Sequence, residues 1–185
     1  MAHSIELLLD PDTDAHIRSI WSALAQAGLP SQARVTSGTN RPHVTLLAAQ
    51  RISPEVDEVL RPLATRFPVA CVVGAPLVFG GPPDRHQRSA SAAYTLAQNI
   101  VPSAELLALH EEVYRLSLPY LIGEPFGHCR PGRWTAHATL GRRFTADEVG
   151  LAMTVVNSNG IDLPAGVTGL RRWDSDERVD HLLVG

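Results

Sequence analysis

The sequence predicts an α+β fold built from two similar halves, and three observations support this prediction. Segments with the spacing of strands and helices alternate along the chain and follow the same order twice. The tripeptide His-x-Thr occurs inside a strand-like segment of each half. The chain of 185 residues is long enough for one domain, and its apolar content is that of an ordinary globular protein.

The first half is predicted to run strand, helix, strand, helix, strand. Asp10 and Pro11 close the first apolar run, after which apolar residues recur at helical spacing. Ser53 offers an N-cap, with Pro54 at the first position of a second helix. The stretch 74–76 interrupts the last strand with a bulge or a turn. The expected elements are a strand at 4–9, a helix ending by residue 28, a strand at 42–49, a helix at 53–67 and a strand at 69–79.

The second half repeats this order. Ser103 caps its first helix, and Thr145 with Glu148 forms a capping box that opens its second helix. The expected elements are a strand at 93–97, a helix from 103, a strand at 134–141, a helix from 145 and a closing strand at 167–173.

This repetition predicts a duplicated unit with a pseudo-two-fold relation. We expect one domain over residues 1–185, with approximate lobes 1–80 and 92–185 between which the chain can exchange segments. An ordinary α+β domain with a coincidentally similar order is the alternative, because the halves share no residue identity beyond the motif. Two loops rich in glycine, proline and arginine, at 80–91 and 119–133, are expected to border a substrate.

Composition excludes several classes of protein. The apolar runs fall well short of the roughly 20 residues that a membrane span needs, and the first residues lack the pattern of a signal peptide. Cys71 and Cys129 form no disulfide framework, which favours a soluble protein of the reducing cytoplasm. The net charge of -3 argues against a protein that coats long nucleic acid. A small anionic ligand or a single RNA end is the expected partner, with no membrane and no obligate protein partner.

All sixteen basic residues are arginine, because the chain contains no lysine. The guanidinium group stays protonated under any physiological condition and is therefore no nucleophile. Enzymes that use a P-loop lysine, a Schiff-base lysine or a lysyl adenylate are excluded together.

The sequences His43-Val44-Thr45-Leu46 and His137-Ala138-Thr139-Leu140 carry the main functional signal. A single His-x-Thr is uninformative, but two copies that each continue with leucine are expected on the order of once in five hundred shuffled sequences. Residues two apart in a strand project from the same face, so each motif offers one imidazole and one hydroxyl to a shared site.

Two such motifs supply what phosphodiester cleavage needs. One imidazole can activate the attacking oxygen as a base, while the other protonates the leaving oxygen as an acid. The two threonine hydroxyls can donate hydrogen bonds to the phosphate oxygens. Neither role requires a metal or another cofactor. The residues leave open which histidine is the base.

The paired motifs, half a chain apart in a repeated strand-helix pattern, resemble those of the two-histidine (2H) phosphoesterase superfamily. That superfamily includes 2'-5' RNA ligase-like proteins and 2',3'-cyclic phosphodiesterases. The resemblance implies a bilobal α+β fold, with antiparallel sheets around a central cleft. It implies that His43 and His137 form the acid-base pair, with His137 activating the water and His43 protonating the leaving oxygen, and that Thr45 and Thr139 bind the phosphate. The implied activity opens a 2',3'-cyclic phosphate at a nucleotide or RNA end, leaving a 2'-phosphate, with reversible 2'-5' joining as a further activity.

Other residues near the second motif are candidates for substrate binding. The segment around it is rich in arginine and free of acidic residues, which indicates a local anion site. The candidates are Arg133, Trp134, Arg142 and Arg143. Arg142 and Arg143 are neighbours in or just after a strand, so only one is expected to face the cleft.

Two other interpretations stay open at this point. One is a module that binds a nucleotide or RNA end without turnover. The other is a metal site that joins His43 and His137 to His128 or Cys129. The metal site has no recognisable ligand spacing. The sequence leaves open whether the substrate is tRNA, a small cyclic nucleotide, an ADP-ribose cyclic phosphate or another compound.

Overall fold

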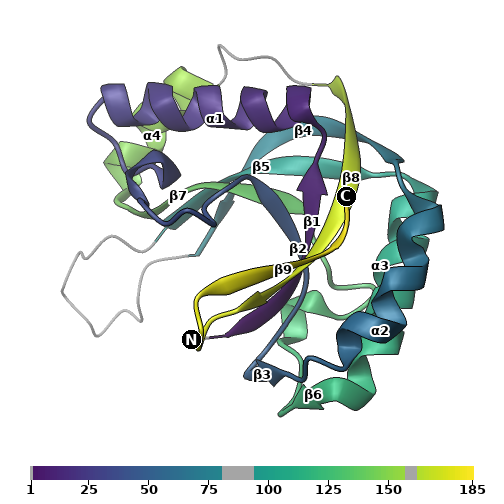
Figure 1. Cartoon of the computed structure of the whole chain (residues 1–185). Helices are drawn as coiled ribbons and strands as arrows, with labels where there is room; N and C mark the ends of the chain where they lie inside the picture. The colour runs from purple at the N-terminus through teal and green to yellow at the C-terminus, as the bar shows by residue number, and fades with distance from the viewer. Residues whose placement is uncertain (1, 81–93, 157–161) are drawn as a thin grey trace.

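The computed structural model describes residues 2–80, 94–156 and 162–185 (Figure 1). The two halves have the predicted order of elements. The first contributes β1 (His3–Leu9), α1 (Pro11–Gln26), β2 (His43–Ala49), α2 (Val56–Leu60) and β4 (Val69–Phe79). The second contributes β5 (Tyr94–Pro102), α3 (Ala104–Ser117), β7 (His137–Phe144), α4 (Ala146–Val156) and β8 (Leu163–Asp174). The α+β class predicted from the sequence is confirmed.

The strands form one antiparallel sheet in the order β2-β1-β8-β4-β5-β7. The order is symmetric between the two halves. If it is read from β7 instead of β2, each position holds the equivalent strand of the other half: β7 in place of β2, β5 in place of β1, and β4 in place of β8. The last strand of each half pairs with the other half, because β8 lies beside β1 and β4 lies beside β5. The pairing of β8 with β4 then joins the two three-stranded groups at the middle of the sheet.

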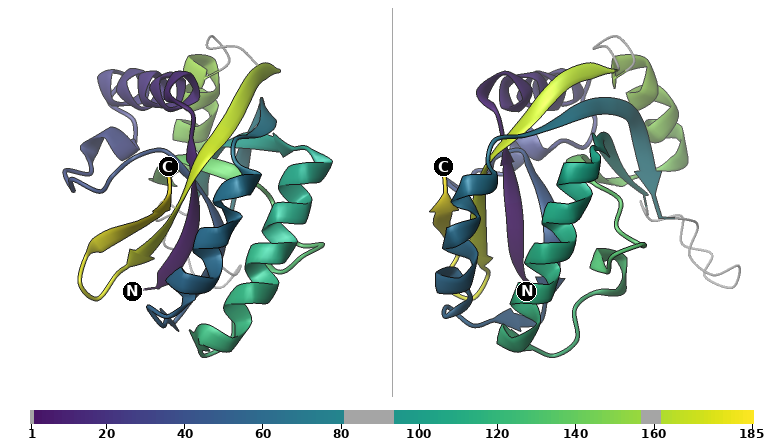
Figure 2. Two further views of the ribbon diagram at one scale, coloured as in Figure 1. Left: turned by 45° about the vertical axis from the view of Figure 1, so that its right-hand side comes forward. Right: turned by 90° about the vertical axis from the view of Figure 1, so that its right-hand side faces the viewer.

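The helices also pair between the two halves. Helix α1 packs against α4, and α2 packs against α3, so each pair combines one helix from each half (Figure 2). Apolar side chains from both pairs and from the strands form one continuous core. No helix of the described residues is long and apolar enough to cross a membrane.

Local sequence signals set the helix starts. The Asp10 carboxylate accepts a hydrogen bond of 2.9 Å from the Thr13 amide and caps α1. Ser103 caps α3 through the amide of Leu106, as predicted. The predicted capping box is also present, since the Thr145 hydroxyl accepts from the Glu148 amide and the Glu148 carboxylate accepts from the Thr145 amide.

The structure differs from the sequence prediction in the second helix. The predicted helix over 53–67 is α-helical only in α2 and continues as a 3-10 helix over Arg61–Arg66. Pro62 explains the change, because proline has no amide hydrogen to donate within an α-helix. The helix also starts later than predicted, with Glu55 and not Ser53 at the N-cap.

Three strands have no counterpart in the prediction. Strand β9 (Val179–Val184) pairs with β8, and the short strands β3 (Arg51–Ile52) and β6 (Leu121–Ile122) pair with each other. The predicted interruption of β4 is a shift of register between Val73 and Pro76. All but the first residue of the predicted loop at 80–91 lies outside the described residues.

Candidate active site

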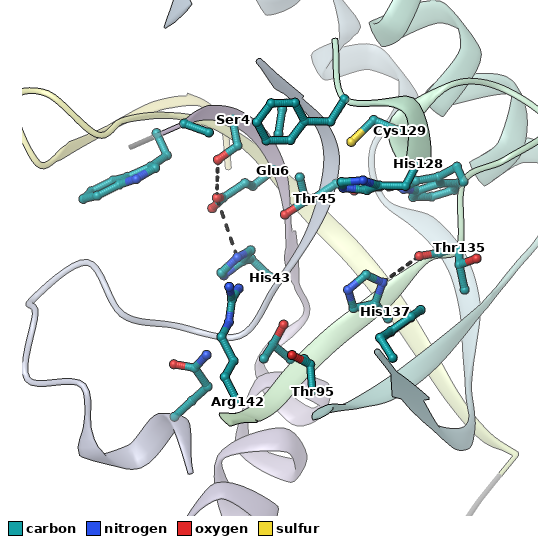
Figure 3. A pocket seen from close by; sticks show the side chains of 18 of the residues that line it. Ser4, Glu6, His43, Thr45, Thr95, His128, Cys129, Thr135, His137 and Arg142 are labelled. Atoms are coloured by element: carbon teal, nitrogen blue, oxygen red, sulfur yellow. Dashed lines mark hydrogen bonds and ion pairs between the residues drawn. The ribbon is translucent and has the colours of Figure 1, made fainter. Parts of the chain in front are cut away.

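The two motif strands face each other across a pocket. Strands β2 and β7 stand at opposite ends of the sheet order, yet they contact each other because the sheet curls. Between them lies a pocket of about 1040 Å³, lined by His43, Thr45, His137 and Thr139 among others. Figure 3 shows His43, Thr45 and His137 among the side chains that line it. The four residues named from the sequence are therefore brought together in one cavity.

Strand alternation explains how each motif presents its side chains. His43 and Thr45 are partly buried and line the pocket, whereas Val44 and Leu46 are fully buried in the core. The same alternation places His137 and Thr139 on the pocket side of β7, with Ala138 and Leu140 in the core.

Both imidazole rings are held in the same way. Nδ1 of His43 lies 2.8 Å from the carbonyl oxygen of Arg41, and Nδ1 of His137 lies 2.7 Å from the carbonyl oxygen of Thr135. Because a carbonyl oxygen only accepts, each Nδ1 carries a hydrogen and donates it. In each neutral ring the lone pair is therefore on Nε2. The backbone fixes one ring orientation and one tautomer at both sites.

Searches with the sequence match no family and no curated protein. Solved structures do match over the whole chain. Usb1 of Kluyveromyces marxianus is 13% identical, with a TM-score of 0.53 over 100% of this chain and 98% of that one. LigT of E. coli, in complex with 3'-AMP, is 16% identical, with a TM-score of 0.53 over 99% of this chain and 94% of that one. A third solved structure, described only as a phosphoesterase, is 17% identical, with a TM-score of 0.50 over 99% of this chain and 94% of that one.

The chain has the 2H phosphoesterase fold. Sequence identities of 13 to 17% establish the fold alone, so the chemistry rests on the residues of the pocket. Usb1 is also solved with uridine monophosphate, and that structure matches with a TM-score of 0.54.

Within this 2H fold, the two histidines have different surroundings. The ring of Phe79 packs against His137 at 4.6 Å between ring centroids. Burial lowers the pKa of His137 below its ordinary value, and the nearby positive charges of His128, His43 and Arg142 act in the same direction. The hydrogen bond to Thr135 opposes this shift only in part. His137 is therefore neutral at neutral pH.

A buried carboxylate stands next to the other histidine. Oε1 of Glu6 lies 3.6 Å from Nε2 of His43, and Glu6 is bound by the Ser4 hydroxyl at 2.6 Å (Figure 3). Arg171, which is buried, pairs with the same carboxylate at 2.8 Å. These three polar residues line the pocket and were missed from the sequence. The alternation of Ser4 and Glu6 with apolar neighbours in β1 could have indicated a polar face there.

Two tryptophans brace the motif strands. Nε1 of Trp134 donates a hydrogen bond to the carbonyl oxygen of Thr45, and Nε1 of Trp21 donates one to the carbonyl oxygen of Thr139. Trp134 also stacks on His110, with 4.1 Å between ring centroids and 5° between ring planes. Trp134 is one of the substrate-binding candidates predicted from the sequence. The structure places it on the pocket wall and also gives it this structural contact.

The arginine candidates separate into two groups. Arg133 and Arg142 are exposed and line the pocket, so both guanidinium groups can meet an anionic ligand. Arg143 is exposed and is not among the pocket residues. Its positive φ of 67° coincides with a shift of register between β7 and β5, where Arg143 has no partner between Arg142 and Phe144.

The group of residues that could hold a metal ion lies outside the pocket. Among the described residues, the ligand atoms that lie close enough to share an ion belong to His3, Asp174 and Asp176. None of these three residues lines the pocket. Arg51 pairs with Asp176 at 2.7 Å, which brings a positive charge against the same cluster. His128 and Cys129 do line the pocket, but they form no such group with the two motif histidines.

Proposed function

We propose that this protein is a metal-independent phosphoesterase of the 2H superfamily that hydrolyses a 2',3'-cyclic phosphate on a nucleotide or an RNA end. The observation that carries the proposal is the pocket between β2 and β7. It holds two imidazole rings with the same fixed tautomer and two threonine hydroxyls, one of each from either half of the chain. Acid, base and phosphate donors are therefore all supplied by the protein.

The proposed reaction is an in-line displacement at phosphorus. A water molecule attacks the phosphorus and gives one proton to Nε2 of the neutral imidazole. The bond from phosphorus to the 3' oxygen breaks, and that oxygen takes a proton from Nε2–H of the protonated imidazole. The product is a 2'-phosphate with a free 3' hydroxyl. Exchange of one proton with solvent returns both rings to their starting states.

The remaining walls of the pocket suit a nucleotide. A cavity of about 1040 Å³ is large enough for a nucleoside with its phosphate. Phe126 and Trp173 line it and offer aromatic surface on which a base can stack. Arg133 and Arg142 can neutralise further phosphates of an RNA strand.

The same site can join RNA ends without ATP. A ribose hydroxyl can replace water as the nucleophile, and the strained cyclic phosphate supplies the energy. The chain has no lysine to carry an adenylate, so the route through a lysyl adenylate is closed. Incubation with labelled ATP should leave the protein unlabelled on a denaturing gel. An adenylated protein band, or joining that requires ATP, would overturn this part of the proposal.

The proposal is tested by incubating the protein with 2',3'-cyclic AMP and with an oligonucleotide that ends in a cyclic phosphate. The parent should convert both, whereas His43→Ala and His137→Ala should each lower the turnover roughly 10²- to 10⁴-fold. His181→Ala in β9 is the matched control and should keep parent turnover, since His181 does not line the pocket. Tight nucleotide binding with no conversion by the parent would favour a binding module instead.

A further inference from the structure

The pseudo-two-fold relation is broken at one row of side chains. Thr45 stands opposite Glu6 in the pairing of β1 with β2, and Glu6 stands opposite Arg171 in the pairing of β1 with β8. The equivalent row in the other half is Thr139, Ala97 and Leu77, from β7, β5 and β4. The first motif therefore has a carboxylate beside it, and the second has a methyl group at the equivalent position.

The Glu6 carboxylate is fixed by several contacts. Arg171 donates from Nε at 2.8 Å, and the Ser4 hydroxyl donates at 2.6 Å. Arg171 is itself held by the Thr39 carbonyl oxygen at 3.0 Å and by Asp180 at 2.9 Å. Burial alone would raise the pKa of Glu6, but the charges of His43 and Arg171, with the hydrogen bonds from Ser4 and Arg171, hold it below its ordinary value. The carboxylate is therefore ionised at neutral pH.

The distance from Glu6 to His43 suits an electrostatic role. At 3.6 Å from Oε1, Nε2 of His43 is close enough for strong attraction but too far for a hydrogen bond of normal length. Nε2–H therefore stays free to donate to a substrate oxygen. Both rings keep Nδ1 for the backbone, so they differ in what lies around the rest of the ring: the Glu6 carboxylate beside Nε2 of His43, and the ring of Phe79 against His137.

Other charged groups around His43 must be counted as well. Strand β7 brings His137 and the guanidinium of Arg142 to the same pocket, and β8 brings Arg171, whose charge is matched by Glu6 and Asp180. Arg41 precedes the motif and lies 3.9 Å from Asp14 of α1. The positive groups on this list favour a neutral ring, and Glu6 is the carboxylate that directly faces His43.

We propose that Glu6 is a positioning residue that acts through His43 and favours the charged form of this ring, which suits the roles that the family resemblance implies, His43 as the acid and His137 as the base. The inference rests on the proposed function for its chemistry, but the charge pair itself does not depend on turnover. The position of Glu6 then fixes how the substrate lies in the pocket: the leaving oxygen is next to His43, and the attacking water is next to His137.

Nuclear magnetic resonance of the histidine rings tests the charge pair without any substrate. Ring signals are followed against pH in the parent and in Glu6→Gln, with His43→Ala and His137→Ala to assign the signals. The His43 signal should titrate about one to two pH units lower in Glu6→Gln, because a neutral amide no longer stabilises the imidazolium. Asp180→Asn is the matched control, since it removes a carboxylate that binds Arg171 but does not face His43. Equal midpoints in the parent and Glu6→Gln would overturn the inference.

Kinetics supply the second readout. With 2',3'-cyclic AMP, Glu6→Gln should lower kcat roughly 10- to 100-fold and move the alkaline limb of the pH profile to lower pH. On a nucleoside nitrophenyl phosphodiester the loss should be much smaller, because nitrophenolate leaves without a proton. Equal losses on both substrates would indicate a general structural defect and contradict the proposed role.

A conservative variant keeps the inference testable if Glu6→Gln does not fold. Glu6→Asp keeps the charge but withdraws it by one methylene group, so it should give intermediate shifts in both experiments. If Glu6→Gln does not fold, a parent-like titration and pH profile in Glu6→Asp would contradict the inference. Failure of the parent to turn over any substrate would count against the proposed function alone, because the titration shift would still be measured.

Discussion

The indole Nε1 of Trp134 donates a hydrogen bond of 2.8 Å to the carbonyl oxygen of Thr45, a residue of the opposite half of the chain. Trp21 makes the reciprocal contact, with a hydrogen bond of 2.9 Å to the carbonyl oxygen of Thr139. Each motif strand is thus braced by an aromatic side chain from the other half. These cross-links fix the separation of two strands that stand at opposite ends of the sheet order.

Replacing Trp134 with phenylalanine should weaken this brace. The ring can still stack on His110, but the carbonyl oxygen of Thr45 loses its donor. We expect a loss of about 1 kcal/mol in the free energy of unfolding, measured by denaturant titration, and a several-fold fall in kcat. Trp21→Phe should behave in the same way through Thr139. Unchanged stability and turnover in both variants would show that the braces are dispensable.

The threonine hydroxyls should matter for turnover and not for folding. Valine matches the shape of threonine and suits a strand, so Thr45→Val and Thr139→Val should fold normally. Each variant lacks one donor to the phosphate, and we expect turnover of 2',3'-cyclic AMP to fall roughly 10²-fold. Thr65→Val, at an exposed position of the 3-10 helix, serves as the control. Parent-like rates in both pocket variants would remove the threonines from the phosphate site.

The acid limb of the pH profile reports on His137 as the base. A base must be unprotonated, so activity falls as the pH drops through the pKa of His137. Because burial lowers that pKa, the limb should lie below the ordinary histidine value of 6.5. The rate of cyclic nucleotide hydrolysis is measured between about pH 4 and pH 9, the range that spans both histidine limbs. An acid limb above 6.5, with chemistry rate-limiting, would contradict this assignment.

The parts of the structure that the sequence predicted are those set by local interactions. Ser103 and the pair of Thr145 with Glu148 act within one helical turn, so their capping roles are visible in the sequence. Strand alternation likewise placed His43 beside Thr45 on one face. These signals sufficed for the order of elements and for the α+β class.

The parts that could not be predicted depend on contacts between distant residues. The pairing of Glu6 with Arg171 joins residues 165 positions apart, and nothing in either local segment indicates the other. The hydrogen bond from Trp21 to Thr139 spans 118 positions in the same way. The first contact follows from the placement of β8 beside β1, and the second from the packing of α1 against β7, so both depend on the arrangement of the whole fold.

The most direct test of the central claim is turnover of 2',3'-cyclic AMP in excess chelator, with the products separated by chromatography. The pocket supplies two imidazoles and two hydroxyls, so the parent should form 2'-AMP at the same rate with and without chelator, while His43→Ala and His137→Ala should form almost none. Loss of activity in chelator that zinc or manganese restores, or near-parent turnover in either histidine variant, would contradict the account.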